Sequence, residues 1–88
     1  MLKIVDYFNL QELSTKWGFR TQYTPMRDLY IYDMIIHYPD DVISVVVDMD
    51  SRLITLEYEL KHGGPSWTNH LDIIYDLIQA GIVEKIEA

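Results

Sequence analysis

The chain has 88 residues, no cysteine, and fourteen acidic against seven basic residues, which gives a formal net charge of −7. A chain of this length builds one hydrophobic core, so we expect a single domain over residues 1–88. The missing cysteines exclude disulfides and thiolate metal sites, and the acidic balance disfavours direct binding to nucleic-acid phosphates. Neither a signal peptide nor an apolar run of the ~20 residues that a membrane helix needs is visible, so we expect a cytoplasmic protein without membrane contact.

The first predicted element is a helix that begins near Asn9. Asn9 and Glu12 have the spacing of a capping box, and Asp6 is an alternative cap. Gly18 is a natural helix end. Between them an apolar stripe recurs at helical spacing and consists of Leu10, Leu13 and Trp17.

A short strand is predicted next, from Phe19 to Tyr23, because apolar and polar residues alternate there. Pro25 ends it, since proline donates no hydrogen bond to a strand ladder. Thr24 with Pro25 is also a plausible helix start, but the aromatic and β-branched residues from Leu29 to Tyr38 favour strand.

The segment from Leu29 to Lys61 predicts three antiparallel strands joined by two acidic turns. A two-residue loop at Asp50–Ser51 makes the apolar faces of the second and third strands coincide. A slip of one residue would place apolar side chains opposite polar ones. The predicted pairs are Ile43–Tyr58, Val45–Leu56, Val47–Ile54 and Met49–Arg52.

For the first turn, loops at Pro39–Asp40 and at Asp40–Asp41 preserve the same side-chain parity, and both stay open. Either loop gives the three strands a common apolar face that helices must cover. The first loop predicts the pairs Tyr32–Val47, Met34–Val45 and Ile36–Ile43.

A second helix is predicted after the loop at 61–66, and it ends at Gly81. Its candidate caps are Ser66, Thr68 and Asn69. Its apolar stripe consists of Leu71, Ile74 and Ile78, widened by Ile73 and Leu77. Ile82–Ile86 then forms a short strand or extended tail. The predicted fold class is α+β, an antiparallel sheet of three to four strands packed with two helices, in the order α-β-β-β-β-α-(β).

The opposite face of the predicted sheet is polar on the third strand but apolar on the first two. An apolar patch of this kind indicates a dimer or partner interface, unless the first helix or the terminal segment covers it. The patch residues are Leu29, Ile31, Ile35 and Val46.

The segment Val45–Leu53 resembles the nucleophile motif of haloacid-dehalogenase-type phosphatases, in which an apolar strand ends in Asp-x-Asp-x-Thr. The resemblance implies that Asp48 accepts phosphate and that Asp50 acts as general acid. Arg52 stands where threonine is usual, and the family has a parallel sheet on a much longer chain. Two aspartates in a tight turn are the simpler interpretation, so we predict a hairpin there.

Other chemistry finds little support in the sequence. The two acidic turns lie at opposite ends of one strand, roughly 25 Å apart, so they cannot share a cation. His37, His62 and His70 lack the spacing of a zinc site, and Ser66 is interpreted as a helix cap. We therefore predict no catalytic residue, no metal and no cofactor.

The predicted function is that of a non-enzymatic, acidic protein-binding domain, such as an inhibitor or decoy that acts on a basic, nucleic-acid-binding protein. Its size and charge are similar to those of phage-encoded inhibitors and toxin-immunity proteins. The alternatives are a homodimeric structural or regulatory module that associates through the outer patch, and a small phosphatase-like or metal-dependent enzyme. The predicted partner-binding residues are Asp40, Asp41, Asp48, Asp50, Glu57, Glu59 and Trp67.

Overall fold

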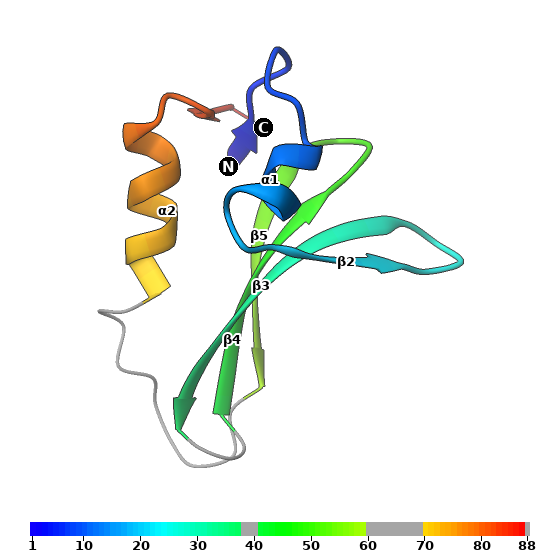
Figure 1. The fold of residues 1–88 in the computed structure, drawn as a ribbon, viewed down its shortest axis with the longest axis vertical. Coiled ribbons are helices and arrows are strands. Elements are labelled where there is room, and N and C mark those ends of the chain that lie inside the picture. The colour runs from blue at the N-terminus through cyan, green and yellow to red at the C-terminus, as the bar shows by residue number, and fades with distance from the viewer. Residues whose placement is uncertain (38–40, 60–69, 88) are drawn as a thin grey trace.

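The computed structural model describes residues 1–37, 41–59 and 70–87. Within these residues the chain is an α+β fold with a six-stranded antiparallel sheet and two helices (Figure 1). The elements are β1 (Leu2–Ile4), α1 (Gln11–Thr15), β2 (Arg20–Tyr23), β3 (Asp28–His37), β4 (Asp41–Asp48), β5 (Leu53–Glu59), α2 (His70–Gln79) and β6 (Val83–Lys85). The strand order is β2-β3-β4-β5-β1-β6.

The sheet has more strands than the three to four predicted from the sequence. The additional strand is β1, which lies between β5 and β6, with Leu2 opposite Ile54 and Ile4 opposite Val83. A strand of three residues is too short to show an alternating pattern, and both of its partners are distant in sequence. The predicted terminal strand is present as β6.

The register of β4 against β5 is the one that side-chain parity predicted. Val47 lies opposite Ile54, and Ile43 lies opposite Tyr58. The connection is four residues, 49–52, between the strand ends, and not the two-residue loop that was expected. Parity therefore determined the pairing although the turn type differed.

The register of β3 against β4 differs from the prediction by two residues. Met34 pairs with Ile43 and not with Val45, and the register shifts again between Ile35 and His37, where the ladder is irregular. A shift of two keeps every side chain on its expected face, so the apolar face is still shared. The turn itself, at 38–40, lies outside the described residues.

The segment between α1 and β3 follows the predicted order. The helix α1 is shorter than predicted: its N-cap is Leu10 and it ends at Thr15, although the backbone N–H of Gln11 donates to Asn9 Oδ1 at 3.1 Å. Gly18, the predicted end, lies three residues beyond Thr15 with a φ of 81°. The predicted strand is β2, and Thr24 belongs to its turn because its hydroxyl bonds with both the carbonyl and the N–H of Arg27. The alternative of a helix that begins at Thr24 is wrong.

Both helices pack on the same face of the sheet, where the main core lies (Figure 1). Leu13 of α1 and Leu77 of α2 are fully buried against Val45 and Val47 of β4, which belong to the same cluster. The core face of α2 contains Ile73 and Leu77, whereas Ile78, predicted to face the core, is 43% exposed. Ile74, also predicted, packs against the same cluster, so the predicted stripe is right except for Ile78, and its centre lies at Ile73 and Leu77. The side chain of Leu71 and the proposed caps at 66–69 lie outside the described residues.

Candidate functional site

The predicted acidic site at the β4–β5 connection is a closed turn. Asp48 Oδ1 accepts hydrogen bonds from the backbone N–H groups of Asp50, at 2.8 Å, and Ser51, at 2.9 Å. The bond from Ser51, with that from Asp50 in support, holds the pKa of the Asp48 carboxyl below its usual value. The Asp-x-Asp motif is thus a hairpin connection, as predicted, and the Asp48 carboxylate is engaged within it.

Arg52 closes the same turn and has two unusual features. Its backbone has a φ of 65°, the left-handed region that residues other than glycine rarely adopt. Its guanidinium donates to the carbonyl oxygens of Val5 and Phe8, both at 2.8 Å. Arg52, which stands where the phosphatase motif has threonine, therefore anchors the segment between β1 and α1.

Among the described residues, two carboxylates on the outer face of the sheet, opposite the helices, are paired with arginines. Glu57 lies 3.6 Å from Arg27, and Asp33 lies 2.6 Å from Arg20. The bond to Arg20, and a further bond from the hydroxyl of Ser44, hold the pKa of Asp33 below its usual value. This face therefore presents less net negative charge than the sequence suggested.

The predicted apolar patch on this outer face is not exposed. Leu29, Ile31 and Val46 are buried and form a small cluster of their own. The exposed residues around them are polar, including Arg20 and Thr55. The expectation of an open apolar surface is therefore corrected, and dimerisation through these residues stays an untested prediction. The side chain of Ile35 lies outside the described residues.

Four of the remaining predicted partner-binding residues cannot be placed relative to these side chains. Asp40 and Trp67 lie outside the described residues, as do the side chains of Asp41 and Glu59. Asp50, in contrast, is described and exposed at the tip of its turn. Of the six predicted carboxylates, the structure therefore brings only Asp48 and Asp50 together in the part that it describes.

A group of exposed residues that contains two carboxylates lies on the solvent side of α2, and it was not among the predicted site residues. Asp72, Tyr75, Asp76 and Gln79 recur at i, i+3, i+4 and i+7, so they share one helix face, and all four are exposed. We call this set the α2 acidic face. Tyr75 is 60% exposed, and Ile78 lies at its border. The helical period that predicts a core stripe also predicts this face on the opposite side of the helix.

No ion pair within the described residues involves a carboxylate of the α2 acidic face. The four ion pairs among the described residues use Lys3, Lys16, Arg20 and Arg27, and Arg52 binds backbone carbonyls. The described residues of α2 include no lysine or arginine. The negative charge on this helix is thus not compensated locally by the cations that neutralise the sheet.

The described part of the chain has neither a cluster of metal-ligating side chains nor a helix that could span a membrane. No three histidine, aspartate or glutamate side chains there converge as metal ligands. No helix among the same residues is long and apolar enough to cross a membrane.

No family model, curated protein or solved structure matches this chain.

Proposed function

We propose that this chain is a non-enzymatic protein-binding domain that uses the α2 acidic face to bind a basic partner. The observation that carries the proposal is the exposure of Asp72 and Asp76 on one helix face, without an ion pair among the described residues. Elsewhere in the described structure, Asp33 and Glu57 have arginine partners, whereas other exposed carboxylates, such as Asp28 and Asp50, also lack an ion pair. What distinguishes α2 is that two such carboxylates share one helix face with an exposed tyrosine.

The two neighbouring carboxylates on α2 destabilise the folded chain, and a basic partner would remove this destabilisation. Carboxylates at i and i+4 repel each other by a few tenths of a kcal/mol on an exposed helix. Asp72 in the first turn is favoured by the helix dipole, but Asp76 is too far along the helix to gain from it. A lysine or arginine of a partner placed between the two would convert the repulsion into attraction.

The aromatic residue within the α2 acidic face adds a non-electrostatic contribution. Tyr75 is 60% exposed between the two carboxylates, and the partly exposed Ile78 follows it. Tyrosine offers a large rigid surface together with a hydroxyl, which is why it is common in binding hot spots. The partner that fits is therefore a basic surface with an apolar depression, such as a nucleic-acid-binding protein that this chain would inhibit as a decoy.

The experiment compares two double variants with the same change in net charge. Asp72→Asn/Asp76→Asn removes the charge of the α2 acidic face, and Asp28→Asn/Asp50→Asn removes the same charge from the β2–β3 and β4–β5 hairpins. Each double variant and the unchanged chain are immobilised separately and incubated with an extract of the native host. The captured proteins are then quantified by mass spectrometry. Circular dichroism first establishes that both variants keep the fold.

We expect a basic protein that the Asp28/Asp50 variant retains and the Asp72/Asp76 variant loses. With that protein purified, the dissociation constant should rise with salt, because exposed charges are screened over about 8 Å at physiological ionic strength. Equal capture by both variants, or an affinity that does not change with salt, would contradict the proposal.

A further inference from the structure

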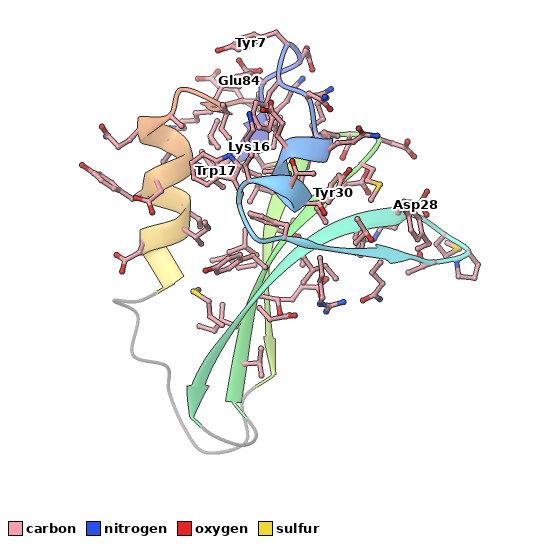
Figure 2. All side chains as sticks on the ribbon, viewed as in Figure 1. Tyr7, Lys16, Trp17, Asp28, Tyr30 and Glu84 are labelled. Carbon is pink, nitrogen blue, oxygen red and sulfur yellow. The ribbon has the colours of Figure 1, made fainter. Side chains whose placement is uncertain are left out.

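A hollow lies on the surface between α1 and the β2–β3 hairpin. Its volume is about 250 Å³. Figure 2 shows Tyr30 beside α1, where it contributes to the lining. The lining residues are Gln11, Ser14 and Thr15 of α1, Thr21 and Tyr23 of β2, and Tyr30 of β3. We call this the hydroxyl-lined hollow.

Every lining side chain is uncharged and carries a hydrogen-bonding group. Five of the six are serine, threonine or tyrosine, and the sixth, Gln11, carries an amide. A hydroxyl both donates and accepts, and an amide provides one group of each kind. A site of this composition matches a ligand that is itself rich in hydroxyls, whereas an anion or a cation would find no opposite charge in the lining.

Tyr30 contributes a buried side chain to the hollow, whose other lining residues are exposed. Its side chain is buried, with only 6% exposed, yet its hydroxyl has no hydrogen-bond partner among the described residues. Because Tyr30 lines an open hollow, water can reach its hydroxyl in the free chain, and a ligand hydroxyl would replace that water. The ligand would then be the hydrogen-bond partner of Tyr30.

Two other residues of the hollow support a cyclic polyol as the ligand. Tyr23 is 72% exposed, so the face of its ring is open to the apolar side of a sugar ring. The Thr15 hydroxyl donates to the Gln11 carbonyl at 3.3 Å, which leaves its oxygen free to accept a hydrogen bond. Donors and acceptors thus surround an open aromatic face.

We propose that the hydroxyl-lined hollow binds a neutral monosaccharide unit, with Tyr30 hydrogen-bonding a sugar hydroxyl and Tyr23 stacking on the ring. The volume of about 250 Å³ suits a ligand of one ring and lies just below the range of drug-sized pockets. A shallow site of this size binds weakly, so dissociation constants on the order of 1 mM are expected.

The test is an NMR titration of the labelled chain with four neutral sugars: glucose, galactose, mannose and N-acetylglucosamine. Glucose 6-phosphate serves as the charged comparison. With at least one neutral sugar we expect saturable shifts of the amide signals of Ser14, Thr15 and Thr21. Tyr30→Phe keeps the ring and removes only the hydroxyl, so it should weaken binding roughly fivefold, while Tyr75→Phe on α2 should not change it.

The proposal is overturned if none of the four sugars gives saturable shifts up to about 100 mM, or if Tyr30→Phe binds as tightly as the unchanged chain. Equal or stronger binding of glucose 6-phosphate with shifts centred on Arg20 or Lys16 would also overturn it, because the ligand would then be the phosphate. The amide spectrum of Tyr30→Phe without sugar establishes that this variant is folded.

Discussion

Arg52 shows how one residue can be unfavourable in its backbone and favourable in its side chain. A left-handed φ costs a residue with a Cβ roughly 1–2 kcal/mol, and Arg52 has a φ of 65°. In return its guanidinium satisfies the carbonyl oxygens of Val5 and Phe8, which are far away in the sequence. The β4–β5 turn and the segment after β1 are therefore stabilised by the same side chain.

Two substitutions separate these contributions. Arg52→Ala removes both hydrogen bonds and keeps the backbone strain, so we expect it to lower the free energy of unfolding by about 1–3 kcal/mol. Arg52→Gly removes the same bonds but relieves the strain, and it should be about 1 kcal/mol more stable than Arg52→Ala. Urea denaturation measures both. An Arg52→Gly variant that is less stable than Arg52→Ala would show that the positive φ carries no strain.

The Asp48 carboxylate predicts a dependence of stability on pH. Its pKa in the folded chain is below the ordinary value of 3.8, chiefly because Ser51 and Asp50 donate to it. A lowered pKa means that its stabilisation is complete above pH 3.8 and is lost as the pH falls through the folded-state pKa. The unchanged chain should therefore lose stability in acid partly through this group.

Asp48→Asn isolates that contribution, because the amide oxygen still accepts both hydrogen bonds but does not titrate. The difference in unfolding free energy between the unchanged chain and Asp48→Asn should be largest near neutral pH and should shrink below about pH 4. Asp50→Asn makes the same change in charge at a carboxylate without a recorded hydrogen bond, so it serves as the control. A difference that grows in acid would contradict the assignment.

At the scale of elements, α2 shows why an apolar pattern can leave the orientation of a helix ambiguous. Its apolar residues at 71, 73, 74, 77 and 78 form two overlapping stripes, and the sequence does not say which is central. Packing decides for Ile73 and Leu77, because they contact the core cluster. The same orientation places Asp72 and Asp76 outward, which explains why the α2 acidic face was missed.

A pair of alanine substitutions tests this orientation. Leu77 is 0% exposed, so Leu77→Ala should lower the unfolding free energy by about 2–5 kcal/mol. Ile78 is 43% exposed, so Ile78→Ala should lower the unfolding free energy by less than about 1.5 kcal/mol. Both changes give alanine in the same helix, so the differences in helix propensity are small. A larger loss for Ile78→Ala would restore the stripe predicted from the sequence.

The strands show which features of a sheet a sequence determines. The β4–β5 pairing followed from parity because both strands alternate regularly up to their turn, as in Val47 opposite Ile54. The β3–β4 pairing differed by two residues, and the irregularity between Ile35 and His37, which accounts for one of them, is not visible in the apolar pattern. Parity predicts faces reliably, whereas the absolute register also depends on such local irregularities.

At the scale of the whole molecule, contacts between distant segments were the least predictable. The hydroxyl-lined hollow combines α1 with two strands, and β1 joins β5 to β6, so each depends on how the elements pack. No local spacing connects Ser14 with Tyr30 or Ile4 with Val83. The composition of the predicted core was accessible from periodicity, but the sites formed between elements were not.

The position of β1 gives a last prediction about the molecule as a unit. Ile4 is fully buried in the same cluster as Leu13 of α1 and Leu77 of α2, so β1 and both helices share one core. If that core unfolds cooperatively, weakening β1 should destabilise every part of the chain to the same extent. Two independently folding halves would instead respond separately.

Ile4→Ala should lower the unfolding free energy by about 2–5 kcal/mol. The measurement combines urea denaturation followed by circular dichroism, which reports the whole backbone, with fluorescence of Trp17 in a Trp67→Phe background, which reports the surroundings of α1. The two probes should give the same midpoint before and after the substitution, and Met26→Ala, at a residue that is 93% exposed, should leave it unchanged. Only a shared core transmits the loss of the Ile4 side chain to the helix. If Ile4→Ala shifts the midpoint measured by circular dichroism but not the midpoint measured by Trp17 fluorescence, β1 and α1 belong to separate folding units.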